Sequence, residues 1–441
     1  MPLICAALGF LVSLLAPAYA NGLYRNGIGA RSMALGGADV AWAEGPLGAL
    51  GANPATLGLL ENPALDIGVI GVVPEGTFQN STNPDSSLRD SVGALPDFAF
   101  GTPLGKLPVG IGIGFDPEAA LQGDWRFVDA PGGADGKTTF GLQNHNSEIL
   151  LLRSALGVGA AVGSKVWIGG SVGLLYNENS LEVPYVFQSH PQLRGLKTLL
   201  NLEADGYGWN GHVGLLFRPT ENWQFGVSYK SESTIQSHGD AFGNAAAQLT
   251  SLGGAFANVR PDFHYDAQVE NVFPQTVSLG ASWQAHPQWR GTLQIDWINW
   301  GDAFVNLPIE LTSGDNADLN SFLSSDSITD VVPLRWRDQF VYRAGIEFAV
   351  TESLALRAGY CFGESPIPSE FVTPLTAAIA EHTATVGLGY RRGRYHVDVA
   401  YQYDLPNRER VVVSGYQSGE YANSSVEVGL HWIGLTTGIR F

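Results

Sequence analysis

Basic residues within a mainly apolar chain are the first candidates for chemistry. Several alternate with apolar neighbours, so basic and apolar side chains would lie on opposite faces of a strand. A guanidinium or ammonium group on the polar face could bind a carboxylate headgroup through charge-assisted hydrogen bonds. Acidic residues share these faces, so the alternative is an ion network that only braces the fold. The candidates for binding a headgroup are Arg153, Lys230, Arg337, Arg343 and Arg357.

Glycines followed by a proline mark a second candidate feature. Gly112 and Gly114 precede Phe115, Asp116 and Pro117. Because glycine weakens a strand and proline cannot donate to its ladder, we expect a kink or bulge here. Either the strand simply ends at Asp116, or the kink opens a gap in the sheet. Through such a gap an apolar molecule could leave sideways without entering water.

Two segments, 192–202 and 239–256, repeat their apolar residues with the period of a helix. Exposed apolar helices are costly unless they cover something. They could pack on one another as a lid, or form an apolar groove that first captures a ligand, and both can hold together. The groove residues would be Leu193, Leu196, Leu199, Leu200, Phe242, Leu249, Leu252 and Phe256.

Catalysis finds little support in the sequence. None of the nine histidines lies in an H-E-x-x-H motif or beside a G-x-S-x-G motif. Cys5 falls in a predicted leader, and Cys361 alone cannot form an intrachain disulfide and disfavours a cysteine-based metal site. We therefore predict no catalytic residue, no metal site and no cofactor.

The composition limits the class of protein. Of 441 residues, 15% are charged and 55 are glycine, and the net charge is −18. A nucleic-acid binder would be basic, a disordered chain less apolar and a helix-rich chain poorer in glycine. Residues 1–20 indicate a signal peptide, in which an apolar run precedes the A-x-A cleavage site Ala18-Tyr19-Ala20. The alternative for this segment is a buried N-terminal helix.

The elements that must position these residues alternate with period two, the mark of half-buried strands. In 335–349, aromatic and aliphatic residues fall mostly on even positions, and basic and small residues on odd ones. Long segments with an apolar outer face and a polar inner face fit a barrel in a membrane better than a soluble sandwich. Fourteen such segments lie near 65–80, 94–104, 107–127, 145–162, 164–185, 203–219, 221–238, 262–286, 288–312, 334–350, 353–366, 379–392, 394–413 and 425–441.

The connections between these segments alternate between short and long, as periplasmic turns and outer loops do in outer-membrane barrels. We therefore predict an all-β fold, a transmembrane antiparallel β-barrel over 64–441 in the outer membrane of a Gram-negative cell. Because Trp432 is out of phase with Phe441, we expect a bulge near Trp432. An aromatic girdle would contain Trp223, Trp289, Trp300, Trp336 and Trp432.

Residues 21–63 do not alternate and are rich in glycine and alanine. The strand side chains of so wide a barrel cannot fill its lumen, so we predict that this segment is a hatch that plugs it. Its main element would be Asn53-Pro54-Ala55, since Asn can hold a turn and Pro fixes the backbone. The alternatives are a periplasmic tail for the segment and a plain linker turn for the Asn-Pro pair.

Several stretches resemble one family. GARSMALGGA at 29–38, ending in Asn53-Pro54-Ala55, resembles the N-terminal hatch of FadL-type outer-membrane long-chain fatty acid transporters. So do the hairpin at 206–230, FPQT at 273–276 with the strand at 297–300, and WRDQFVYR at 336–343 through RAGY at 357–360 to SPIP at 365–368. The order and spacing of these stretches carry the resemblance, which covers essentially the whole mature chain.

The resemblance implies a hatch-plugged barrel of about fourteen strands, outer loops that capture ligand and an inward kink in the third strand for lateral exit. It also implies passive uptake of hydrophobic molecules, which we expect to be long-chain fatty acids. Within the family, the alternative is an aromatic hydrocarbon channel. Outside the family, the alternatives are a structural or adhesive barrel without a specific ligand and a barrel esterase. We further expect a monomer in contact with outer-membrane lipid and lipopolysaccharide, with no nucleic-acid partner.

Overall fold

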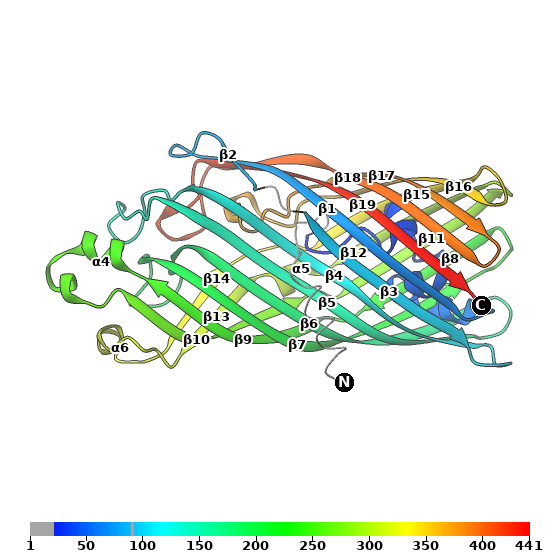
Figure 1. The fold of residues 1–441 in the computed structure, drawn as a ribbon, viewed down its shortest axis with the longest axis horizontal. Coiled ribbons are helices and arrows are strands. Elements are labelled where there is room, and N and C mark those ends of the chain that lie inside the picture. The colour runs from blue at the N-terminus through cyan, green and yellow to red at the C-terminus, as the bar shows by residue number, and fades with distance from the viewer. Residues whose placement is uncertain (1–21, 90–91) are drawn as a thin grey trace.

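The computed structural model describes residues 22–89 and 92–441, which form a closed antiparallel barrel (Figure 1). All nineteen strands belong to one sheet, and the last strand, β19 (Ser424–Arg440), pairs with the first, β1 (Ala64–Gln79). Four barrel strands are interrupted and count as two each, and β2 (Ser86–Ser87) is a short addition beside β1, so the barrel has fourteen strands. The predicted fold is confirmed. The predicted signal peptide, 1–20, lies outside the described residues.

The strands follow one another around the barrel in chain order. The uninterrupted ones are β1, β3 (Gly93–Pro103), β4 (Val109–Val128), β5 (Leu142–Ala161), β6 (Val166–Val186), β7 (Lys197–Phe217), β16 (Leu354–Gly363), β17 (His382–Arg392), β18 (Tyr395–Val411) and β19. The interrupted ones are β8 (Trp223–Lys230) with β9 (Ser233–Asn244), β10 (Asp262–Phe273) with β11 (Thr276–His286), β12 (Trp289–Ile298) with β13 (Asn306–Thr312), and β14 (Ile328–Pro333) with β15 (Gln339–Ala349). Short helices in the connections are α4 (Ala246–Leu252), η2 (Gly254–Asn258), α5 (Trp300–Ala303), α6 (Ala317–Leu323), η3 (Ser369–Phe371) and η4 (Gln417–Gly419).

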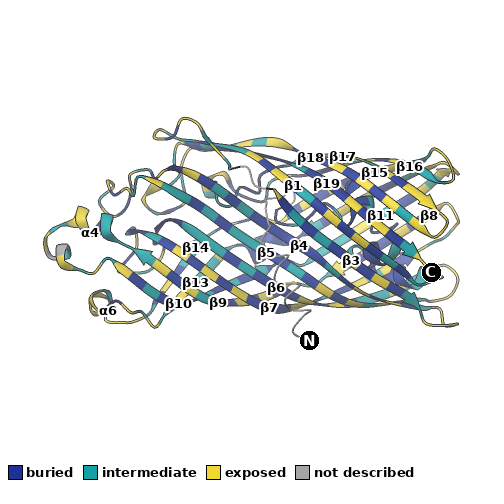
Figure 2. Ribbon diagram, viewed as in Figure 1, coloured by how far each residue is buried: buried dark blue, intermediate teal, exposed yellow. Residues whose placement is uncertain are grey.

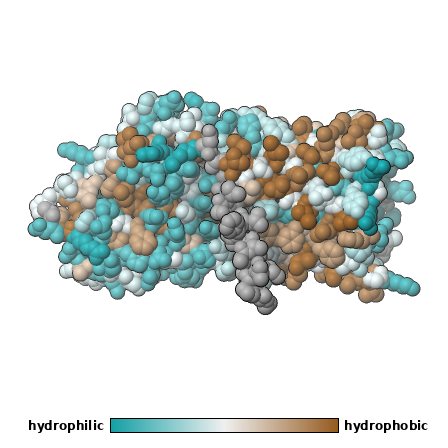
Figure 3. All heavy atoms as spheres, viewed as in Figure 1, coloured by the Kyte–Doolittle hydropathy of each residue, from teal (hydrophilic) through white to brown (hydrophobic). Residues whose placement is uncertain are grey.

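Burial alternates along most strands, as Figure 2 shows. On β15, Tyr342 and Ile346 are 49% and 45% exposed, whereas Val341 and Arg343 point inward and are buried. The outward apolar side chains gather on the half of the barrel that holds the C-terminus, and the other half is mainly hydrophilic (Figure 3). The apolar half therefore has the surface of a membrane belt, and the hydrophilic half extends beyond it.

No helix in the part of the chain that the structure describes is both long and apolar enough to cross a membrane.

The predicted aromatic girdle is wrong for three of its five tryptophans. Trp223 and Trp289 are exposed on the outer surface, but Trp300, Trp336 and Trp432 are buried inside the barrel. Trp300 and Trp336 pack with Phe304 in an aromatic cluster, whereas Trp432 donates its indole N–H to Asp404. Alternation alone does not show on which side of the wall an aromatic residue finds such contacts.

The bulge expected near Trp432 is absent from the pairing of β19 with β1, which runs without a register shift through that residue. Trp432 points into the lumen and donates its Nε1–H to Asp404 Oδ2 at 2.7 Å. The irregularity lies instead in β18, between Asp404 and Asn407. Pro406 in this interval has no N–H to give to the ladder.

The segment predicted as one strand over 288–312 is interrupted by α5. Trp300 of α5 packs at 5.1 Å from Phe304 and 5.0 Å from Trp336, measured between ring centroids. Tyr24 approaches the Trp300 ring at 5.3 Å. Burial of these rings offsets the lost strand pairing, because each aromatic residue buries a large apolar area.

Residues 22–63 lie inside the barrel, at the end that holds the C-terminus (Figure 1). They form two short helices and a 3-10 helix: α2 (Ala30–Ala34), α3 (Gly45–Gly51) and η1 (Pro54–Leu59). Most of their side chains are buried against the wall. We call residues 22–63 the hatch segment.

Candidate functional site

Asn53 connects the hatch segment to the barrel wall. Its Nδ2 donates to the carbonyls of Val40 at 2.8 Å and Leu215 at 3.1 Å, and its Oδ1 accepts from the amide of Ala55 at 3.1 Å. Asn53 is completely buried and caps η1. A wall glycine makes room for η1, since a Cβ on Gly159 would lie 2.6 Å from the η1 backbone. The Asn53-Pro54-Ala55 element is thus a docking contact between the hatch segment and β5–β7.

β4 is irregular at the predicted kink. Its pairing with β3 ends at Phe98 and Phe115, and its register with β5 shifts between Pro117 and Ala119. Residues 116–121 are buried on both faces of the strand, and the start of the hatch segment packs against them. Gly112 and Gly114 lie just before the irregularity, where they contact the hatch segment through Leu50 and Leu57.

The start of the hatch segment fills the gap left beside this irregularity. Tyr24 makes a β-bridge with Ala119. Arg25 donates to the carbonyl of Pro117 at 3.0 Å and forms an ion pair with Asp97 of β3 at 3.4 Å. One side chain therefore connects the two strands whose own pairing has ended.

A second feature is an apolar cavity of about 390 Å³ among the outer loops. It lies between the 187–198 segment, α4, η2 and α6. We call it the outer groove. Of the predicted groove residues, it is lined by Leu193, Leu196, Leu249, Leu252 and Phe256.

The other three predicted groove residues lie elsewhere, because most of 192–202 is not helical. β7 begins at Lys197, so Leu199 and Leu200 fall on opposite faces of a strand, and Leu200 packs into the buried core. Phe242 is on β9, 54% exposed, and stacks on His264. The helix predicted at 239–256 exists only from Ala246 onward. Pairing with β6 and β9 gives the 197–202 backbone a hydrogen-bond ladder that local periodicity cannot reveal.

A smaller cavity of about 130 Å³ lies deeper in the lumen. We call it the lumen cavity. Tyr185, Tyr416 and Tyr421 line it together with aliphatic residues from β6, β7, β10, β13 and β14, and no lysine or arginine is among the described residues that line it. Glu420, in the loop after β18, also lines it, and burial raises the pKa of this carboxyl to about 7. The sequence missed these tyrosines, since nothing local distinguishes them from other loop aromatics.

Four of the five headgroup candidates form ion pairs. Arg343 Nε is 2.5 Å from Asp296, and Arg357 Nη1 is 2.5 Å from Asp398. Both pairs lie inside the barrel: the first joins the neighbouring strands β15 and β12, and the second joins β16 to β18 across β17.

Glu118 of β4 pairs with two further candidates. Lys230 Nζ lies 2.6 Å from its carboxylate and Arg153 Nε 3.8 Å from it. Arg153 also donates to the carbonyl of Leu50 in the hatch segment. Arg337 differs from the rest, because it is exposed in the connection between β14 and β15 rather than on a lumen face.

Comparisons with known proteins agree with this architecture. Residues 9–441 match the family described as "Outer membrane protein transport protein (OMPP1/FadL/TodX)". The long-chain fatty acid transport proteins of Escherichia coli O157:H7 and Shigella flexneri are each 22% identical to this chain, with 72% of both chains covered.

Solved structures share the fold. The toluene transporter TodX of Pseudomonas putida has a TM-score of 0.74 at 19% identity, covering 94% of this chain and 99% of its own. A FadL homologue of Pseudomonas aeruginosa has a TM-score of 0.70 at 13% identity, covering 97% and 99%. Together with the match over nearly the whole sequence, the barrel and its plugged lumen show that this chain belongs to the OMPP1/FadL/TodX family of outer-membrane transport proteins.

Proposed function

We propose that this protein takes up long-chain fatty acids by diffusion, without ATP or a cofactor. The observation that carries the proposal is the outer groove, an apolar cavity of about 390 Å³ among loops on the hydrophilic half of the barrel. Apolar concavities with few polar groups are the usual binding sites of hydrophobic ligands. The curated relatives are named as long-chain fatty acid transport proteins, which supports this substrate class.

The proposed path continues inward through one buried apolar cluster. Phe187 and Leu193 of this cluster line the outer groove, and Leu202 and Ile309 line the lumen cavity. From there the ligand would pass the start of the hatch segment and leave sideways beside the kink in β4. Lateral exit avoids transfer of an apolar molecule into periplasmic water, which would be unfavourable by about 25 cal/mol for each Å² of apolar surface.

Aromatic hydrocarbons are the second candidate substrate. The lumen cavity has no basic residue among its described lining, and four of the predicted headgroup cations are already neutralised by carboxylates. A neutral ligand needs no cation, so this chemistry favours a hydrocarbon at the deeper cavity. We expect the protein to act as a monomer, in contact with lipid and lipopolysaccharide.

The test is uptake of radiolabelled oleate and toluene in cells that lack their own carrier. Leu249→Glu places a charge in the outer groove and should slow uptake, whereas Phe242→Glu, outside the groove, is the matched control. Faster oleate uptake with the wild-type protein supports the fatty acid proposal, and faster toluene uptake alone supports the second candidate. If neither compound enters faster than in cells without the protein, the transport proposal fails.

A further inference from the structure

The end of the barrel that holds the short turns and the C-terminus contains a large cavity, about 940 Å³ between the hatch segment and the wall. We call it the periplasmic vestibule. Its acidic lining residues Glu61 and Glu221 lie exposed, and Glu44 belongs to the hatch segment. Its basic lining residues are Lys165, Arg218, Arg290, Arg391 and Arg440. A chain with a net charge of −18 thus carries a local excess of cations at this mouth.

Several guanidinium donors at the vestibule lack a hydrogen-bond partner. The Nε atoms of Arg218 and Arg290 are buried and unpartnered among the described residues. So is Nη2 of Arg31, which belongs to the hatch segment just behind the vestibule wall. Buried donors normally find a partner, and an unmade hydrogen bond is costly. These buried atoms do not face the cavity, so an oxyanion in the vestibule would pair with the exposed Arg391 and Arg440 and with the terminal nitrogens of Arg290.

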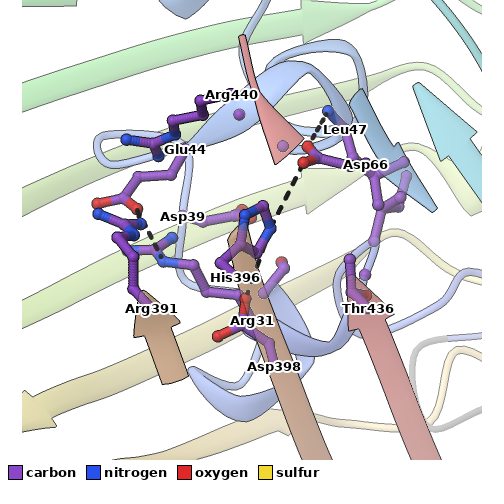
Figure 4. A pocket seen from close by; sticks show the side chains of 15 residues that line it. Arg31, Asp39, Glu44, Leu47, Asp66, Arg391, His396, Asp398, Thr436 and Arg440 are labelled. Atoms are coloured by element: carbon purple, nitrogen blue, oxygen red, sulfur yellow. Dashed lines mark hydrogen bonds and ion pairs between the residues drawn. The ribbon is translucent and has the colours of Figure 1, made fainter. Parts of the chain in front are cut away.

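Glu44 already occupies part of this cluster. Its Oε2 lies 3.3 Å from Nη2 of Arg391 and 3.6 Å from Nε of Arg31, both longer than a close charged pair. Figure 4 shows Glu44 with Arg440 on one side and Arg391 and Arg31 on the other. Burial alone would raise the pKa of Glu44, but Arg31, Arg391 and Arg440 hold it well below its usual range. Glu44 thus acts as an internal ligand that connects the hatch segment to β17.

Flat apolar surfaces stand beside these cations. The Trp42 ring lies between the guanidinium groups of Arg31 and Arg290, at 4.1 Å and 4.4 Å from the ring centroid. Trp167 lies 5.2 Å from the guanidinium of Arg218. Leu59 and Leu60 of the hatch segment line the same cavity. A ligand suited to this surface has an apolar chain next to an anionic group.

We propose that the periplasmic vestibule is a binding site for an amphiphilic anion. A carboxylate or phosphate group pairs with Arg290, Arg391 and Arg440, and the apolar chain lies on Trp167, Leu59 and Leu60, because Trp42 is 5% exposed and its ring is already covered by Arg31 and Arg290. The bound anion competes with Glu44 for Arg391 and so removes one connection between the hatch segment and the wall. The site lies apart from the outer groove and lumen cavity, and its occupancy does not depend on whether uptake is observed.

The experiment measures binding to the purified full-length barrel in an uncharged detergent. Indole fluorescence is quenched with 11-bromoundecanoate or with the uncharged 11-bromoundecanol, and the signal of the vestibule is the difference between wild type and Trp167→Phe. We expect the carboxylate to bind at least about tenfold more tightly than the alcohol, as one charge-assisted contact allows. Equal binding of the two compounds would overturn the proposal.

Variants locate the site and protect the test against misfolding. Arg391→Gln and Arg290→Gln should each weaken binding about tenfold, whereas Arg392→Gln, next in the chain but outside the vestibule, should not. Glu44→Gln should tighten binding, because it removes the internal competitor, and this gain cannot come from a damaged barrel. Weaker binding by Glu44→Gln, or equal binding by the Arg391 and Arg392 variants, contradicts the proposal.

Competing ligands identify the source of the anion. Displacement of the probe by dodecanoate more than by dodecyl phosphate indicates a free fatty acid, and the reverse order indicates a phospholipid headgroup. Either order supports a site that binds an anionic group attached to an apolar chain. If inorganic phosphate displaces the probe as effectively as either amphiphile does, the apolar chain contributes nothing to binding and the proposal is overturned.

Discussion

Replacement of Asn53 by alanine should release the hatch segment without unfolding the barrel. The substitution removes two hydrogen bonds to the carbonyls of Val40 and Leu215 and the one that caps η1. At about 1 kcal/mol net for each hydrogen bond, the loss is about 3 kcal/mol. Since about 1.4 kcal/mol corresponds to a factor of ten, the undocked state of η1 should become on the order of 100 times more populated.

Hydrogen exchange of the backbone amides of 55–59 measures this population directly. We expect exchange in Asn53→Ala to rise on the order of 100-fold, while the strands keep their protection and the heat-modifiable folded band on gels remains. Oleate uptake should fall, because the displaced hatch segment no longer shapes the lumen. Asn62→Ala is the control, since Asn62 is exposed at the end of the same segment. Exchange within about threefold of wild type would refute the docking role, and loss of the folded band would make Asn53 structural for the barrel.

Three further outcomes test the packing and electrostatics. Gly159→Val should dislodge the hatch segment and increase leakage of a hydrophilic antibiotic, because its Cβ would lie 2.6 Å from the hatch backbone, whereas Gly170→Val, whose Cβ would lie no closer than 3.6 Å to other atoms, should not. Arg357→Gln removes the partner of two carboxylates, Asp398 and Glu347, and should lower the free energy of unfolding in urea by about 3–5 kcal/mol. Arg408→Gln, at an exposed pair, should lower it by about 0–1 kcal/mol, and equal losses would contradict the buried pairing. Burial raises the pKa of Glu420 from 4.5 to about 7, so loop packing is tightest below the lower value and loosens as pH rises through about 7. Proteolysis of 412–423 should therefore speed up as the pH rises from about 5 to about 7 in wild type but not in Glu420→Gln, and parallel pH profiles would show that another group titrates.

Most of the barrel could be predicted from local pattern. Successive strand side chains point to opposite faces, so the alternation in a run such as 339–348 predicts which side chains face the lumen and which face outward. The irregularity in β4 could also be predicted locally. The missing N–H of Pro117 and the weak strand propensity of glycine disturb a strand whatever its tertiary surroundings. The absence of any such alternation in 21–63 was enough to separate the hatch segment from the strands.

The candidate site was less predictable, because its contacts join residues far apart in the chain. Leu199 and Leu200 follow a helical period, yet they form a strand because β6 and β9 offer their backbone hydrogen bonds. The Trp432 side chain points into the lumen from β19, where Asp404 accepts its indole N–H. Neither partner can be identified from periodicity.

The amino-acid sequence by itself determined the class of fold and the family, since the alternation of the strands and the order of the family stretches can be read along the chain. The bounds of the hatch segment and the role of the kink stay predictions. Only the tertiary structure decided which cations are neutralised, which loop residues line a cavity and what fills the gap beside β4. Arg25 illustrates the difference, because nothing in the first residues of the hatch segment indicates that its side chain will connect Pro117 to Asp97. Such contacts arise when closure of the barrel brings distant segments together, and burial then fixes the partner of each charge.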